Sequence, residues 1–110
     1  MLDTEVLGEL RVLGDDDLRD LVDLYFADVV TQLENLRQAL GEGDADAIAA
    51  AAHRIKGASL SIGAARVAAL ATELETAGRS AELSTCGGLI AELDSELDPT
   101  RSALSAELSV

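Results

Sequence analysis

The sequence has few aromatic residues, a single cysteine and a single proline. Tyr25 and Phe26 are its only aromatic side chains, although 48% of its 110 residues are hydrophobic. A core with this composition must be built from aliphatic side chains, and a sequence rich in Ala and Leu favours helices over strands. Cys86 has no partner for a disulfide or a pair of metal ligands, which excludes a disulfide framework and indicates a reducing compartment.

Basic residues are also scarce, and this excludes several classes of partner. Lys and Arg number 8 against 21 Asp and Glu, for a formal net charge of −13. That charge leaves no basic footprint for a nucleic-acid backbone and disfavours an anionic membrane surface. The N-terminus lacks the basic start and continuous apolar segment of a signal peptide, and no run reaches the roughly 18 apolar residues of a membrane helix. We expect a cytoplasmic protein with neither a nucleic-acid nor a membrane partner.

Hydrophobic periodicity predicts five helices in a single domain that spans residues 1–110. A short N-terminal helix is expected at about residues 4–13, and the segment GDDD after it supplies aspartates that we expect to cap the next helix. Between Asp17 and Leu40 the apolar residues recur at steps of three and four, which predicts one long amphipathic helix. The segment GEGD at 41–44 is expected to end that helix.

The third helix carries its apolar residues on one side. Asp44 or Asp46 is expected to cap its start, and Gly63 to end it. The stripe that we expect to be buried consists of Ile48, Ile55 and Ile62.

The last two helices are expected at about residues 65–78 and from about residues 81–84 toward the C-terminus. Pro99 interrupts the last one: either a single helix bends there, or Asp98 caps a second segment, and we favour the bend. Short connections between long amphipathic helices imply antiparallel neighbours. The predicted fold is all-α, an antiparallel up-down four-helix bundle with a short N-terminal capping helix and a last helix kinked near Pro99.

The only histidine, His53, faces away from the isoleucine stripe, at roughly 160° from Ile55 around the helix axis. A lone histidine on a helix surface often has no function. One histidine without further nitrogen and sulfur ligands does not make a zinc site, so we expect no metal. The sequence also lacks the G-x-S-x-G elbow of hydrolases and the G-K-[ST] loop that holds ATP phosphates, so we expect no cofactor.

The neighbours of this histidine suit a reaction with a phosphoryl group, toward which an exposed imidazole is a good nucleophile. Lys56, one turn along the helix, lies where an ammonium can pair with phosphoryl oxygens. Gly57 removes bulk beside the imidazole at a cost of about 1 kcal/mol relative to alanine, which close approach of a partner protein would explain. Ala49, Leu60 and Ala64 share this side of the helix and are expected to complete the docking surface.

The segment AHRIKGASLSIGA resembles the signature of the histidine-containing phosphotransfer (HPt) family, roughly A-H-x-L-K-G-x-x-x-x-x-G-A. The flanking segments LVDLYFADVV and LATELETAGR also resemble the family, so the likeness covers roughly residues 18–79 and, more loosely, the last helix. A small hydroxyl residue that is common after K-G is replaced by Ala58, whereas Ser59 is kept.

The resemblance implies a phosphoryl carrier without an ATP site of its own. HPt domains are helical bundles that take a phosphoryl group from an aspartate of one receiver domain and pass it to another. By this resemblance, His53 would be phosphorylated on Nε2, Lys56 would steady the phosphoryl group and Gly57 would give the receiver access. The match for the family's histidine-orienting residue is Glu75, expected to accept a hydrogen bond from Nδ1, and Arg79 would add positive charge nearby.

The partners implied are response-regulator receiver domains or a hybrid histidine kinase, with Mg²⁺ held by the receiver, and we expect a monomer. Arg54 and Lys56 make the surroundings of His53 the least acidic part of the chain, which suits the acidic pocket of a receiver. Two alternatives remain. The chain could be the phosphoacceptor domain of a chemotaxis-type histidine kinase, although the absence of a kinase module favours a free-standing carrier. It could also be an acidic helical interaction bundle that uses the tail at 97–108 and in which the histidine has no role.

Overall fold

The computed structural model describes residues 1–110 as five helices with no strands, so the all-helical prediction is confirmed. The helices are α1 (Thr4–Leu10), α2 (Asp15–Glu42), α3 (Ala45–Ile62), α4 (Ala65–Arg79) and α5 (Leu83–Leu108).

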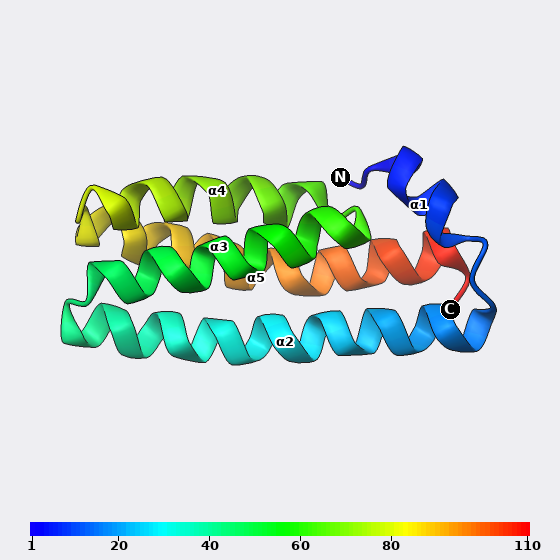
Figure 1. Cartoon of the computed structure of the whole chain (residues 1–110), viewed down its shortest axis with the longest axis horizontal. Coiled ribbons are helices and arrows are strands. Elements are labelled where there is room, and N and C mark those ends of the chain that lie inside the picture. Colours follow the sequence, from blue (N-terminus) through cyan, green and yellow to red (C-terminus); the bar gives the residue numbers. More distant parts are fainter.

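The four long helices lie alongside one another in an elongated molecule of 43 × 21 × 19 Å (Figure 1). α3 packs against both α2 and α4, and α5 packs against the same two helices. The short helix α1 contacts α3 near one end of the molecule, where the C-terminus also lies (Figure 1). This arrangement places α3 between α2 and α4, with one of its sides facing solvent.

The ends of α2 and α3 follow from local sequence. The Asp44 side chain accepts a hydrogen bond of 3.0 Å from the amide of Ala47 and caps α3. Gly43 ends α2 with φ at 67° and Gly63 ends α3 with φ at 78°, a left-handed conformation that glycine adopts without steric penalty. These positions agree with the predictions made from the glycines and aspartates.

The start of α2 differs from its prediction. Its N-cap is Gly14, which offers no side-chain hydrogen bond, and the three aspartates of the GDDD segment lie inside the first turn. The expectation that these aspartates cap the helix is therefore wrong. Their negative charges nevertheless lie at the positive end of the helix dipole and therefore stabilise the helix. The short helix before them is also shorter than expected, since it ends at Leu10.

The core is made mostly of aliphatic side chains from all five helices, together with Tyr25, Phe26 and Cys86. Ile48 and Ile55 of α3 are fully buried and Ile62 is 2% exposed, as the stripe predicted. Each such side chain contributes about 1.5–3 kcal/mol when it leaves water. The leucines of the other helices that are at most 2% exposed are Leu7, Leu33, Leu36, Leu70, Leu74, Leu93 and Leu104.

α5 runs through Pro99 as one helix, so the alternative in which Asp98 caps a separate segment is wrong.

Cys86 is fully buried in the same helix. None of the helices contains a segment long and apolar enough to span a bilayer.

Candidate functional site

His53 lies on the solvent-facing side of α3, and its side chain is 66% exposed. This agrees with the position predicted from the helical period, because Ile55, on the opposite side of the helix, is fully buried. The imidazole is therefore accessible to another molecule while its helix is anchored in the core.

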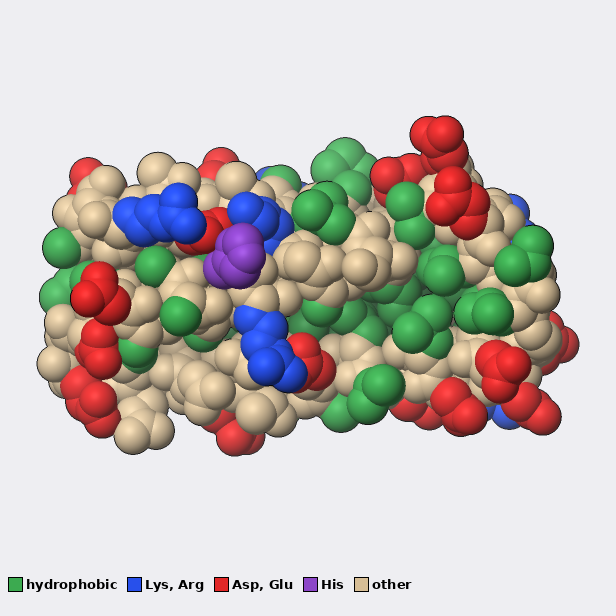
Figure 2. Space-filling model, viewed as in Figure 1, with side chains coloured by type: hydrophobic (Ala, Val, Ile, Leu, Met, Phe, Trp, Pro, Cys, Tyr) green, Lys and Arg blue, Asp and Glu red, His purple; other side chains and the backbone are tan.

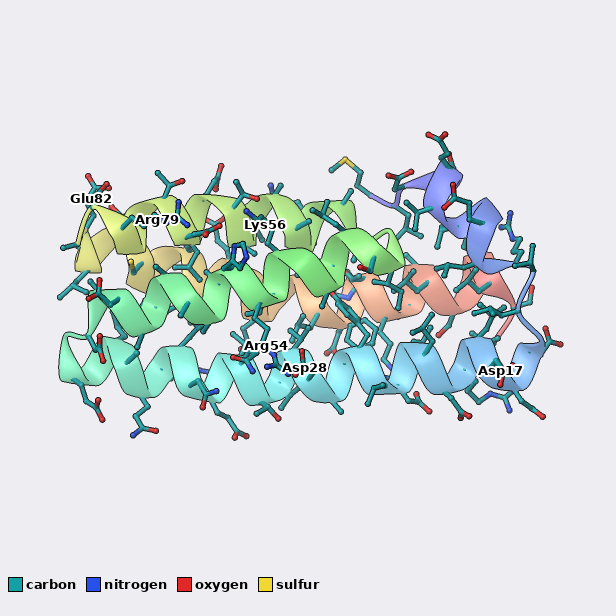
Figure 3. The ribbon with its side chains drawn as sticks, in the orientation of Figure 1. Asp17, Asp28, Arg54, Lys56, Arg79 and Glu82 are labelled. Atoms are coloured by element: carbon teal, nitrogen blue, oxygen red, sulfur yellow. The ribbon has the colours of Figure 1, made fainter.

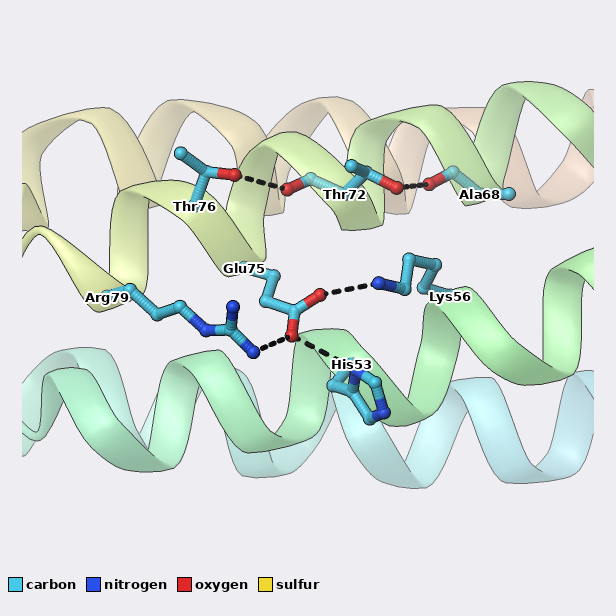
Figure 4. Close-up of polar contacts among 7 residues, drawn as sticks. All are labelled: His53, Lys56, Ala68, Thr72, Glu75, Thr76 and Arg79. Atoms are coloured by element: carbon cyan, nitrogen blue, oxygen red, sulfur yellow. Dashed lines mark hydrogen bonds and ion pairs between the residues drawn. The ribbon is translucent and has the colours of Figure 1, made fainter.

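The residue that faces His53 from the neighbouring helix is Glu75 of α4, which is only 5% exposed. Glu75 Oε2 lies 3.0 Å from His53 Nδ1 and accepts a hydrogen bond of 2.7 Å from Arg79 Nη2. The other carboxylate oxygen, Oε1, accepts a hydrogen bond of 2.9 Å from Lys56 Nζ. Figure 4 shows these three side chains converging on one carboxylate. The structure thus brings together four residues that the sequence analysis selected.

The charge state of Glu75 determines which nitrogen of His53 carries a proton. The hydrogen bond from Lys56 and the positive charges of Arg79 and Lys56 lower the pKa of Glu75, although its burial acts in the opposite direction. An ionised carboxylate can only accept hydrogen bonds, so Nδ1 of the imidazole must be the donor. In the neutral ring, Nε2 is then unprotonated and keeps its lone pair. Figure 4 shows the far side of the ring pointing away from the carboxylate. The arrangement therefore exposes a nucleophilic nitrogen.

The residues predicted to form a docking surface occupy different environments. Gly57 is exposed, and a Cβ atom at this position would meet no heavy atom within 4 Å. Leu60 is 59% exposed. Ala64 is fully buried, because the turn after α3 carries it inward to the start of α4, and its assignment to the docking surface is wrong. Ala49 is half-buried, with its backbone against Gly78 of α4.

Positive side chains surround His53, whereas most acidic side chains visible in the same view lie toward the two ends of the molecule (Figure 2). Arg54 and Lys56 leave α3 on opposite sides, Arg54 toward α2 and Lys56 toward α4 (Figure 3). Arg54 forms an ion pair of 3.1 Å with Asp28 of α2. The local charge around the imidazole therefore opposes the strongly negative charge of the whole chain.

A groove of about 400 Å³ between α2 and α3 was not predicted from the sequence. Leu24, which is 69% exposed, lines it together with Arg54. The remaining lining residues are Leu21, Tyr25, Asp28, Ala58, Ser61 and Ile62. The sequence does contain a sign of this groove: Leu21 and Leu24 are hydrophobic but lie outside the apolar stripe that α2 buries. Elsewhere in the structure, no group of three His, Cys, Asp or Glu side chains is placed to hold a metal ion.

Residues 20–103 match the family model described as the Hpt domain. The chain is 30% identical over 103 residues to histidine-containing phosphotransfer protein 2 of Arabidopsis thaliana. That alignment covers 87% of this chain and 66% of the plant protein, so the chain spans a little less than two thirds of that relative's length. The fold is similar to the crystal structure of histidine-containing phosphotransfer protein B from Pseudomonas aeruginosa PAO1. The TM-score is 0.89 at 33% sequence identity, and the match covers 98% of this chain and 94% of that chain.

Proposed function

The chain belongs to the Hpt domain family, the histidine-containing phosphotransfer domains of phosphorelays, and from this premise we propose which of its residues carry and stabilise the phosphoryl group. We propose that His53 is the phosphoacceptor. The observation that carries this proposal is the 3.0 Å contact between Nδ1 and the buried Glu75, which in the neutral ring assigns the proton to Nδ1 and leaves the lone pair of Nε2 free.

The transfer step follows from this geometry. The lone pair of His53 Nε2 attacks the phosphorus atom of an aspartyl phosphate in a receiver domain, and a P–N bond forms as the P–O bond to the aspartate breaks. The aspartate leaves as a carboxylate, and the proton on Nδ1 stays on the ring. Positive charge therefore develops on the imidazole beside the ionised Glu75, which stabilises it. The reverse step passes the phosphoryl group to the aspartate of another receiver.

Lys56 and Arg79 are proposed to supply positive charge to the phosphoryl oxygens. Both are held next to the imidazole by their hydrogen bonds to Glu75. The Lys56 side chain is 28% exposed and that of Arg79 is 70% exposed, so each reaches the surface on which a phosphoryl group would lie. The dianionic group would compete with the carboxylate of Glu75 for these two cations.

The proposed partner is a receiver domain, either of a response regulator or of a hybrid histidine kinase. Its Mg²⁺ and acidic pocket would complete the chemistry, so this chain would act as a carrier without an ATP site or a catalytic cofactor. Gly57 and Leu60 would form the docking surface. An acidic partner would be attracted to the positive charge around His53 and repelled by the acidic surface elsewhere on this chain. We propose a monomeric protein in the cytoplasm.

The same family membership supports the finer features of the predicted architecture. We propose that α2 to α5 form an antiparallel up-down bundle with α1 as its cap, in keeping with their packing partners. We also propose that α5 bends at Pro99, because proline removes a backbone donor inside the helix.

The test is phosphotransfer from phosphorylated receiver domains to the purified chain. His53 should be labelled, and His53→Ala should not be. The variant should keep its helical circular dichroism and its melting temperature, because Glu75 retains two partners and substitutions at exposed positions usually change stability by about 0.5 kcal/mol or less. Labelling only by the ATP-binding domain of a chemotaxis-type kinase would favour the alternative phosphoacceptor role. Labelling by neither donor would contradict the phosphotransfer assignment of His53.

A further inference from the structure

Gly78 lies where α4 approaches the backbone of α3. A Cβ atom at Gly78 would lie 2.9 Å from the amide nitrogen of Ala49 and 3.2 Å from both the Ala49 Cα and the Ala45 carbonyl oxygen. All three atoms belong to the α3 backbone, so no side-chain rotation can make room. A larger residue at this position would have to move one helix relative to the other.

No turn accounts for this glycine. The glycines with positive φ are Gly43 and Gly63, whereas Gly78 lies inside α4, which ends at Arg79. Glycine inside a helix is unfavourable relative to alanine. Close contact with α3 is therefore the structural reason for a glycine here, and it also explains why Ala49 is half-buried.

The contact lies next to the proposed phosphoacceptor site. Ala49 is one turn before His53 on α3, and Gly78 is one turn after Glu75 on α4. Residues three or four apart share one face of a helix, so the two helices meet at two adjacent levels: Ala49 with Gly78, and His53 with Glu75. The spacing at the first level constrains the spacing at the second. The distance between His53 Nδ1 and Glu75 Oε2 is 3.0 Å, so it can lengthen by only a few tenths of an ångström before the hydrogen bond is lost.

We propose that Gly78 is a positioning residue for His53. By letting α4 lie directly on the α3 backbone, it holds the Glu75 carboxylate within hydrogen-bond distance of Nδ1 and so keeps the ring in the tautomer with a free Nε2. The importance of this position for phosphotransfer rests on the proposed function of His53, whereas the effect on the ring is independent of it.

The test compares Gly78→Ala with Gly88→Ala. Gly88 is a matched control, since it is an exposed glycine inside α5 and a Cβ there would meet no heavy atom within 4 Å. NMR of the imidazole nitrogens should show His53 held as the Nδ1–H tautomer in the wild type and in Gly88→Ala. In Gly78→Ala it should show a mixture of tautomers. Labelling of His53 by phosphoramidate, which needs no docking surface, should slow about tenfold in Gly78→Ala only. A folded Gly78→Ala with the wild-type tautomer and labelling rate would overturn the proposal.

Glu75→Asp keeps the proposal testable if Gly78→Ala does not fold. This change withdraws the carboxylate by about 1.5 Å, the length of one C–C bond, without adding an atom at the helix contact. The same mixed tautomers and slower labelling are expected. If Glu75→Asp kept the wild-type tautomer and rate, the helix spacing could not be critical and the proposal would fail. Labelling by phosphorylated receivers distinguishes a failure of this proposal from a failure of the proposed function. If no receiver labels the wild type, the proposed function is contradicted. If receivers label the wild type and Gly78→Ala equally, only the role of Gly78 is contradicted.

Discussion

The two sides of α3 that face its neighbouring helices are organised in different ways. Toward α4, a buried carboxylate, Glu75, collects hydrogen bonds from His53, Lys56 and Arg79. Toward α2, the polar contacts are a single buried hydrogen bond of 2.6 Å between Tyr25 and Ser59 and an ion pair between the exposed Arg54 and the half-buried Asp28. An open groove lies beside them. The α4 side can therefore control the chemistry of the imidazole, whereas the polar contacts on the α2 side do not reach the imidazole and support the fold.

Glu75→Ala should have the largest effect on the α4 side. Without the acceptor, the ring would populate both tautomers and more than one orientation, so Nε2 would be less often free and less well aimed. We expect labelling of His53 to slow about 10- to 100-fold with phosphoramidate and with a receiver alike. An unchanged labelling rate, together with an unchanged tautomer in the NMR spectrum, would show that Glu75 has only a structural role and does not orient the imidazole.

The pH dependence of stability offers a control for the same variant. Because the pKa of Glu75 is lowered in the folded chain, its ionised form stabilises the fold above its ordinary pKa of 4.5. That contribution disappears as the pH falls through the lower pKa of the folded state. The difference in unfolding free energy between wild type and Glu75→Ala should therefore be largest above about pH 4.5 and should shrink in acid. A difference that stayed constant down to acid pH would contradict an ionised Glu75.

Gly57→Gln tests the exposed surface between the two sides of α3. The space above Gly57 is open, so the larger side chain should not disturb the fold. It should instead block a receiver and slow transfer about tenfold, a loss of about 1.4 kcal/mol of transition-state binding. Labelling by phosphoramidate should continue at the wild-type rate. Equal slowing with both donors would show that Gly57 acts on the histidine itself and not on docking.

Tyr25→Phe should have the smallest effect on transfer and should act through stability. Tyr25 is 5% exposed and Ser59 fully buried, so removal of the phenol leaves the serine hydroxyl without its partner in the core. We expect the free energy of unfolding to fall by about 1–2 kcal/mol, measured by urea denaturation. Removal of both groups in Tyr25→Phe with Ser59→Ala should restore much of this loss, because no buried polar group then lacks a partner. A marked change in phosphoramidate labelling of Tyr25→Phe would show that the α2 side of α3 also affects the imidazole, and would contradict the distinction drawn between the two sides.

The helices and the position of His53 could be predicted because they depend on local patterns. The isoleucine stripe of α3 defines its buried side and therefore directs His53 to solvent. Gly63 and Asp44 mark the ends of α3 through conformations and hydrogen bonds formed by residues only a few positions apart. The family signature around His53 then indicated which chemistry an exposed imidazole could serve.

Contacts between helices could be predicted only in part. The resemblance indicated Glu75 as the partner of His53, but no sequence pattern placed both Lys56 and Arg79 on the same carboxylate. The same angular reasoning that was right for Leu60 was wrong for Ala64, because Ala64 lies beyond the end of α3, where the turn has left the helical path.

By itself, the sequence determined the helical class of the fold, the boundaries of α3 and the exposure of its histidine, because helical periodicity and capping act over a few neighbouring residues. Tertiary structure alone decided that Glu75 is buried with three donors and that Gly78 rests on the backbone at Ala49. Both depend on the spacing and axial offset of α3 against α4. Those quantities result from the packing of the whole core, and no single segment of the chain encodes them.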